Sequence, residues 1–204
     1  MTVVPLRHYI LAGGRSRRFG SDKARYRIDG RPMIQRVADA FTPLCFSTTV
    51  VAQRPNQYAD LGLPTIADLR PDAGPIEGLR TALRHAHRLT HQQPTPTPTS
   101  PWILLSSCDL YRPHLSHVQP LAQALCPNTL ASVWTDDERF EPFPGLFHQR
   151  LLESPDLRTA TSFQRLLTQL GPQTATMPRE TQTAHPIPWD LDHRPTDLDM
   201  TLQP

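Results

Sequence analysis

The chain has 204 residues, a formal net charge of +2, and 21 basic against 19 acidic side chains. This balance gives no general case for binding nucleic acid or an anionic membrane, and no apolar run approaches the ~18 residues that cross a bilayer. The length favours one domain over residues 1–204. Three cysteines without a CxxC pair, and an N-terminal apolar run too short for a signal peptide, predict a reduced, cytoplasmic protein.

Short apolar runs alternate with helical patterns along the chain. Strands are expected at residues 8–12, 47–52, 64–67, 102–107 and 130–135. Helices, in which apolar residues recur at helical spacing, are expected at residues 32–41, 75–89 and 161–170. This alternation of continuous apolar strands with helices predicts an α/β fold whose mostly parallel sheet is covered on both faces.

Two segments interrupt the alternation. His91–Pro101, HQQPTPTPTSP, is rich in Pro and Thr and has no apolar face, so it is interpreted as an extended, solvated loop inserted within the domain at about 91–101. Arg139–Phe147, RFEPFPGLF, is strand-like. It is interpreted either as the wall of a pocket for a flat ligand or as an edge strand in the core.

Polar residues follow three of the expected strands, at the edge of a parallel sheet where ligands bind. The first group is the loop LAGGRSRRFGSDKA, residues 11–24. Gly13 and Gly14 allow a positive φ and a close approach of backbone N–H groups to an anion, while Arg18 and Lys23 add positive charge suited to a triphosphate. The spacing is neither Walker A nor GxGxxG. A plain turn with a solvated basic face fits the composition equally well.

The other two groups are carboxylates. Asp109 ends the strand LLSSCDL, and Mg²⁺ prefers one or two carboxylates together with phosphate oxygens and water. Asp68 follows the third strand and could accept hydrogen bonds from a base or ribose, beside a helix that starts after Gly74-Pro75 and offers its N–H groups to a ligand. Both aspartates could instead cap helices or turns. Near the C-terminus, Asp190 and Asp192 could add a second metal carboxylate or belong to a solvated acidic tail.

Other reactive side chains have weaker patterns. The histidine pairs 85/87 and 114/117 lack the carboxylate or Cys companions of a zinc site. Cys108 is most simply a small core residue, because a catalytic thiol would need a placed base.

These motifs, taken in order, resemble the nucleotidyltransferases of the molybdenum cofactor guanylyltransferase group. LAGGRSRRFGSDKA is similar to the signature LAGGxSxRMGxDK, with Phe19 in place of Met. DAGPIEGLRTAL is similar to a GPLxG segment that opens a helix, and LLSSCDLYRP to a strand ending in a metal-binding Asp. RFEPFPGLF and WDLDHRPTDL resemble two later segments, so the likeness extends from Leu6 to about Leu198.

The resemblance implies a Rossmann-like three-layer α/β/α sandwich and transfer of GMP from Mg·GTP to molybdopterin with release of pyrophosphate. It implies GTP and molybdopterin as substrates, Mg²⁺ as cofactor, and molybdoenzyme-specific chaperones or other cofactor-biosynthesis proteins as partners. By position, Lys23 and Asp68 would contact the nucleotide, and Asp109 would hold Mg²⁺. Catalysis would depend on Arg18, Lys23 and Asp109. The nucleotide would also contact Leu11, Ala12, Gly13 and Gly14.

Two departures from the family pattern concern the base. The closing segment carries Asp190 and Asp192 where Asn is usual, a form also found in relatives that use CTP. The segment VVAQR after the second strand lacks an Asn found in some guanylyltransferases. A cytidylyltransferase of the same fold, acting on molybdopterin or another phosphorylated small molecule, is therefore one alternative. A non-catalytic nucleotide-binding protein that handles the cofactor is another.

Overall fold

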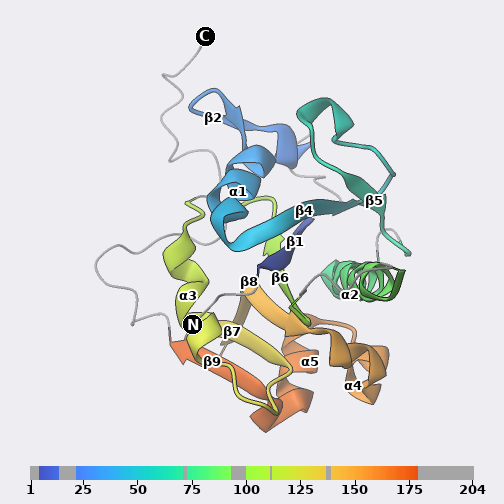
Figure 1. Cartoon of the computed structure of the whole chain (residues 1–204), viewed down its shortest axis with the longest axis vertical. Helices are drawn as coiled ribbons and strands as arrows, with labels where there is room; N and C mark the ends of the chain where they lie inside the picture. The colour runs from blue at the N-terminus through green and yellow to red at the C-terminus, as the bar shows by residue number, and fades with distance from the viewer. Residues whose placement is uncertain are drawn as a thin grey trace.

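The computed structural model describes residues 5–13, 22–70, 73–92, 100–110, 112–136 and 139–178 (Figure 1). Seven strands form one sheet in the order β5-β4-β1-β6-β8-β7-β9. In that order they span Thr65–Ala67, Cys45–Ala52, Leu6–Leu11, Trp102–Ser107, Arg139–His148, Ala131–Asp136 and Thr174–Pro178. Within the described part of this sheet, the β8 pairings with β6 and β7 are antiparallel and the other four are parallel, which confirms the mostly parallel sheet.

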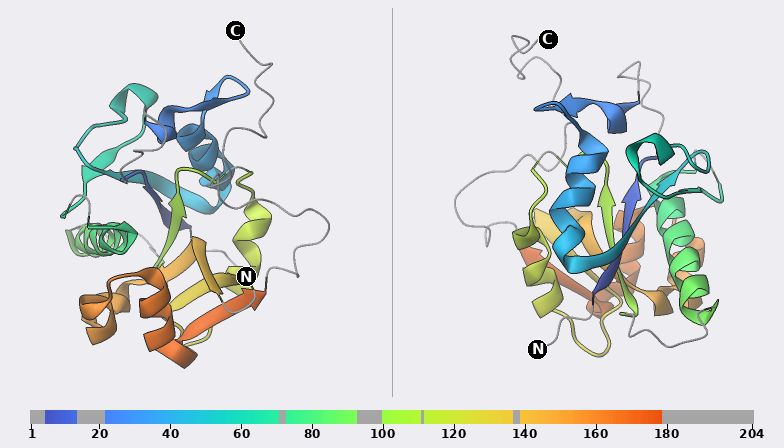
Figure 2. Two further views of the ribbon diagram at one scale, coloured as in Figure 1. Left: turned by 180° about the vertical axis from the view of Figure 1, so that it is seen from behind. Right: turned by 45° about the horizontal axis from the view of Figure 1, so that its top comes forward.

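Helices cover both faces of the sheet, as Figures 1 and 2 show. One face carries α2 (Pro75–Gln92), α4 (Pro155–Thr159) and α5 (Phe163–Leu170), and the other carries α1 (Met33–Phe41) and α3 (Gln119–Gln123). The predicted α/β/α sandwich is therefore confirmed. Beside the sheet lies a hairpin of β2 (Arg27–Ile28) and β3 (Arg31–Pro32). The short 3₁₀ turns are η1 (Lys23–Arg25), η2 (Thr42–Leu44), η3 (Ala59–Leu61), η4 (Leu115–His117), η5 (Gln149–Glu153) and η6 (Gly171–Gln173).

The central strands β1 and β6 are mostly apolar because both of their faces are buried, and most of their few polar residues are buried as well. In β1, Tyr9 and Leu11 pack into the cluster under α2, whereas Ile10 packs into the cluster under α1. Neighbouring β6 divides in the same way, with Leu105 on the α2 side and Leu104 on the α1 side. Successive side chains of a strand point to opposite faces, so a strand between two helical layers has no face turned to solvent.

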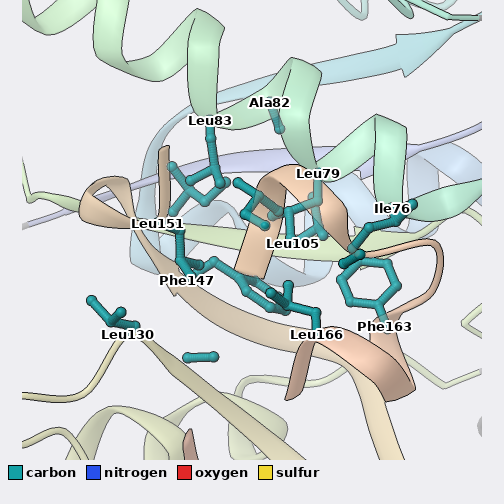
Figure 3. Close-up of a cluster of buried hydrophobic side chains, with 14 of the residues drawn as sticks. Ile76, Leu79, Ala82, Leu83, Leu105, Leu130, Phe147, Leu151, Phe163 and Leu166 are labelled. Carbon is teal, nitrogen blue, oxygen red and sulfur yellow. The ribbon is translucent and has the colours of Figure 1, made fainter. Parts of the chain in front are cut away.

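The α2 face holds the larger of the two cores (Figure 3). Ile76, Leu79 and Leu83 of α2, which the helical spacing predicts on one face, lie above Leu105 of β6 and Phe147 of β8. All five side chains are at most 1% exposed. Burying a side chain of this size contributes roughly 1.5–3 kcal/mol, so this contact fixes the position of α2 on the sheet.

Strand β8 is not an edge strand, and that expectation was wrong. It lies between β6 and β7, although it contains Pro142 and Pro144. The pairing with β6 begins only at Gly145, and the register with β7 shifts across the same stretch, so the prolines remove no ladder hydrogen bond there. A Cβ atom on Gly145 would stand 2.4 Å from the Pro142 carbonyl oxygen, so this bulge requires glycine.

Several expectations fall on other parts of the chain. Gly14, Arg18, Asp190 and Asp192 lie outside the described residues, as does most of the Pro/Thr segment. The first two residues of that segment, His91 and Gln92, are helical, so the expectation of a loop is wrong for these two residues. Among the described residues, no helix is both long enough and apolar enough to span a membrane.

Candidate functional site

A pocket of about 360 Å³ opens at the carboxyl ends of the central strands. The chain runs from β1 to β4 on one side of β1 and returns through β6 on the other side. The order of strands therefore reverses at β1, and ligands of open α/β sheets bind at such a point. Residues that follow each of these three strands line the pocket: Ala12 after β1, Gln53 after β4, and Asp109 after β6.

Backbone hydrogen bonds hold the three strand ends together. The Ala12 amide donates to the Val51 carbonyl (2.9 Å), and the Cys108 amide donates to the Leu11 carbonyl (3.1 Å). These bonds continue the parallel ladders just beyond the strands. Asp109 is thereby fixed beside the segment that carries Ala12 and Gly13.

Lys23 and Asp109 meet across this pocket. The Lys23 Nζ donates to Asp109 Oδ2 at 2.8 Å, with side chains 14% and 21% exposed. Lys23 is the only lysine of the chain, all other fixed cations being arginines. The amine and the carboxylate expected to act on the same ligand therefore lie at one pocket, within reach of each other.

Lys23 owes its position to the residue before it. Asp22 caps the turn η1, accepting a hydrogen bond from the Ala24 amide at 3.1 Å. The Tyr58 hydroxyl donates to both Asp22 carboxylate oxygens, at 3.1 and 3.0 Å. Arg25 then ties the other end of the turn to Asp60 at 2.7 Å. The turn that presents Lys23 is thus anchored to the segment following β4.

Burial keeps two neutral side chains protonated at this site. Burial raises the pKa of the Tyr58 hydroxyl, and the negative charge of Asp22 raises it further, so Tyr58 stays a hydrogen-bond donor. Burial, followed by the charge of Asp109, raises the pKa of the Cys108 thiol. Cys108 lines the pocket but is a thiol rather than a thiolate, so it is not an activated nucleophile.

Gly13 lines the pocket in a backbone conformation that other residues also adopt. Its φ lies outside the left-handed region, and an added Cβ would meet only the Ala52 Cα, at 4.0 Å. The positive φ that glycine allows is therefore not used at Gly13. Gly74 does have a positive φ (88°), and α2 begins directly after it at Pro75, which lines the pocket. The predicted helix start beside the site is confirmed.

Asp68 is the remaining predicted nucleotide contact, and it is not one of the described residues that line this pocket. Its carboxylate accepts a hydrogen bond from the Thr81 hydroxyl at 2.7 Å, and its amide donates to the Ala52 carbonyl at 2.7 Å. Asp68 therefore joins the end of β5 to α2 and β4. Its contact with a nucleotide stays a prediction.

The sequence interpretation missed several residues of the pocket. Asp22 could have been found, because an Asp before a short turn is a common N-cap. Phe143 of β8 also lines the pocket and stacks edge-on against Phe163 of the core, with ring centroids 5.2 Å apart. The interpretation of the segment 139–147 as a pocket wall is therefore confirmed at Phe143, although the sequence did not single out this residue. Arg54 and Gln57 come from the loop after β4 and carry no sequence pattern that marks them as site residues.

The described residues of the pocket could supply part of a Mg²⁺ coordination shell, but not all of it. Within the part of the chain that the structure describes, no three His, Cys, Asp or Glu side chains gather in a metal-binding cluster. Mg²⁺ usually takes one or two carboxylates, with phosphate oxygens and water completing its shell. Asp109 supplies one partly exposed carboxylate in the pocket, whereas the Asp22 oxygens already accept hydrogen bonds from Tyr58. The site suits an ion that arrives with a phosphate ligand.

Solved structures share this fold. A protein of Aquifex aeolicus VF5 (Aq1419) is 24% identical, with a TM-score of 0.65 over 85% of this chain and 86% of that one. The molybdopterin-guanine dinucleotide biosynthesis protein A of Archaeoglobus fulgidus is 21% identical, with a TM-score of 0.61 over 86% of this chain and 85% of that one.

Proteins with similar sequences have names related to that of the Archaeoglobus fulgidus protein. A Serratia proteamaculans protein named molybdenum cofactor guanylyltransferase is 33% identical over 153 residues, which are 73% of this chain and 70% of that protein. A Deinococcus radiodurans protein named "Probable molybdenum cofactor guanylyltransferase" is 37% identical over 137 residues, 65% of this chain and 68% of that one. The profile described as the MobA-like NTP transferase domain matches residues 8–175. The chain therefore belongs to the MobA-like NTP transferase family.

Proposed function

We propose that this protein transfers GMP from Mg·GTP to molybdopterin, releasing pyrophosphate and forming the guanine dinucleotide cofactor. The observation that carries the proposal is the meeting of Lys23 and Asp109 in a pocket at the switch point of the sheet. Membership of the MobA-like family and the names of the relatives support this substrate pair.

The reaction brings two anions together. A phosphate oxygen of the acceptor attacks the α-phosphorus of the triphosphate, the bond to the bridging oxygen breaks, and pyrophosphate leaves. The barrier is dominated by charge repulsion and misalignment, so positioned cations and amides provide most of the catalysis. Among the described residues, the pocket supplies the Lys23 ammonium and the backbone of Ala12 and Gly13. The proposal also includes Gly14 and Arg18 as anion contacts.

Lys23 and Asp109 have complementary roles in this proposal. Bound Mg²⁺ would neutralise charge on the phosphate oxygens, and Asp109 is the residue that would hold it. With nucleotide in the pocket, Lys23 turns from Asp109 to a phosphate oxygen and offsets the charge that builds at the α-phosphate and leaving group. The ion pair holds both side chains in place before the nucleotide arrives.

The reaction requires no covalent enzyme intermediate. The acceptor phosphate is itself the nucleophile and is already ionised near neutral pH. Cys108 lies at the pocket, but burial keeps its thiol protonated. We therefore assign the protein a binding and electrostatic role without a side-chain nucleophile.

The test is a nucleotide panel. Purified protein, Mg²⁺ and molybdopterin are combined with GTP, CTP, ATP or UTP, and pyrophosphate release is measured. The proposal expects release that depends on molybdopterin and is fastest with GTP, and almost none from the Lys23→Met variant. Faster release with CTP would show that the nucleotide substrate is CTP rather than GTP. No release from any of the four nucleotides would contradict the proposed reaction.

A further inference from the structure

A second pocket, of about 190 Å³, lies on the α2 side of the molecule and shares no lining residue with the first. It is walled by α2, by the start of the β5–α2 loop and by α4, which lies beside α2 in Figures 1 and 2. Glu77, Arg80 and Arg84 of α2 line it and follow one another at helical spacing, so they share one face. Arg70 and Arg158 line the other sides.

Two of the charged groups of this pocket are used by the fold itself. Glu77 is 3% exposed, and Arg80 Nη1 donates to its carboxylate at 2.8 Å. Arg80 also donates to the carbonyls of Leu157 (3.0 Å) and Ala160 (2.6 Å) at the end of α4. Arg80 thus fastens α4 to α2, and the only carboxylate among the described lining residues is already neutralised.

The other three arginines are exposed, and none of them has an ion-pair partner among the described residues. No side-chain hydrogen bond or ion pair is found for Arg70, Arg84 or Arg158 within the described part of the chain. Four arginines against one glutamate leave the described lining with a charge of +3. Guanidinium groups gathered at one pocket repel one another, and an anion that contacts them together removes this cost.

We propose that this pocket binds a small, multiply charged phosphate anion, represented by inorganic pyrophosphate. Guanidinium groups match phosphate oxygens in paired hydrogen bonds, which a halide cannot accept, and the charge of +3 favours a multiply charged anion over a monocarboxylate. The volume is below the roughly 300–1,000 Å³ of pockets that enclose larger organic ligands. The described lining contains no aromatic ring on which a base could stack, so the site is suited to the phosphate part of a ligand rather than to a nucleoside.

The test is calorimetric titration with inorganic pyrophosphate, without metal or nucleotide. The Lys23→Met background weakens binding of this anion to the first pocket, so the remaining heat reports on the second. In that background we compare the double variant Arg84→Gln/Arg158→Gln with Arg88→Gln, which removes an exposed arginine of the same helix that does not line the pocket.

The double variant is expected to bind pyrophosphate at least about tenfold more weakly, because two charge-assisted contacts are lost. Arg88→Gln is expected to bind like the Lys23→Met parent. Equal affinity in all three proteins would overturn the proposal. Parallel titrations compare the affinities for inorganic phosphate and for glycerol phosphate. The tighter of the two shows whether the natural ligand is a free inorganic anion or the phosphate group of an organic molecule.

A second measurement covers the possibility that the double variant unfolds. In the protein with Lys23→Met as its only change, the side-chain Nε–H signals of Arg84 and Arg158 are assigned by NMR and followed during the pyrophosphate titration. Saturable shifts of these two signals, with that of Arg88 unmoved, would support the site. Unchanged signals at millimolar pyrophosphate would contradict it. Because no nucleotide is present, either result is independent of the proposed transfer reaction.

Discussion

Lys23 and Asp109 are 86 positions apart in the chain, and their side chains form an ion pair 2.8 Å long. The contact arises because β1 and β6 are parallel neighbours, so their carboxyl ends lie at one edge of the sheet. Asp109 lies two residues beyond the end of β6, whereas Lys23 is held near the end of β1 by a turn that Asp22 and Tyr58 anchor. The proposed chemistry depends on this pair.

Removing either charge of the pair should abolish most turnover while the fold persists. Lys23→Met keeps the aliphatic stem, and Asp109→Asn keeps the shape, so each deletes mainly an electrostatic contribution. Loss of one such contact costs on the order of 3 kcal/mol, about a hundredfold in rate. Turnover is measured as pyrophosphate release at saturating Mg·GTP, with circular dichroism to check the fold.

Arg165→Gln is the matched control, because it removes an exposed cation of α5 outside the described pocket. It should leave turnover unchanged. Full turnover in Lys23→Met or Asp109→Asn would show that the residue in question was assigned the wrong role.

Tyr58→Phe should weaken the turn that presents Lys23. The variant loses the hydroxyl that donates to both Asp22 oxygens, and hydrogen bonds to charged groups contribute roughly 1.5–3 kcal/mol. The expected result is lower stability in urea and a turnover loss smaller than that of Lys23→Met. Tyr26→Phe, at a side chain 46% exposed, is the control and should change neither value. Wild-type stability in Tyr58→Phe would mean that Tyr58 does not hold the turn.

Gly145→Ala should destabilise the protein. The new methyl group would stand 2.4 Å from the Pro142 carbonyl oxygen and 2.9 Å from the Phe147 ring, inside a buried strand. Overpacking of this kind costs about 1–3 kcal/mol, measured from the urea midpoint.

Gly13→Ala is the informative comparison. The backbone at Gly13 accepts a Cβ without a clash, so stability should match the wild type. A loss of nucleotide affinity in this stable variant would show that the ligand itself needs close access to the Gly13 backbone. If Gly145→Ala were as stable as Gly13→Ala, the tight packing described around β8 would be incorrect.

Stability should fall in mild acid because His8 is buried in neutral form. His8 is wholly buried, lies 2.8 Å from the Ser106 hydroxyl, and has its pKa lowered by burial to about 3. The unfolded chain binds a proton near the ordinary value of 6.5, whereas the folded chain resists it until about pH 3. His8 therefore leaves stability intact above about pH 6.5 and lowers it progressively as the pH falls toward 3.

Urea unfolding between pH 7 and pH 4 measures this effect, with a slope of about 1.4 kcal/mol per pH unit for each such group. His117, whose pKa burial also lowers, to about 4, adds to the same trend. His8→Gln should reduce the slope by about one proton. An unchanged slope in that variant would show that His8 is not the group responsible.

Much of the fold follows from local patterns. The apolar spacing of α1, α2 and α5 and the short apolar strands predict the elements because each is buried on a defined face. The position of β8 did not follow, since two prolines usually mark an edge, and only the register shift opposite β7 explains their place in the middle of the sheet. Strand β9 was missed because it is short and only partly buried.

The site was predictable where it follows a strand directly. Asp109 and Gly13 each come two residues after the end of a strand, β6 and β1, so the parallel sheet itself brings them together. The tie between Asp22 and Tyr58 joins residues 36 positions apart through a loop, and no period or spacing encodes such a contact. Asp68 also follows a strand, but its carboxylate accepts a hydrogen bond from Thr81 and so stabilises the fold. The position of a carboxylate at a strand end therefore does not by itself identify a ligand contact.

The most direct test of the central claim uses the single lysine of the chain. Selective ¹³C labelling of lysine gives one side-chain Cε signal, which is followed by NMR during titration with Mg·GTP in wild-type protein and in Asp109→Asn. The account predicts a saturable shift in wild-type protein and a much weaker response in Asp109→Asn. A Lys23 signal that stays unmoved at saturating Mg·GTP would contradict it.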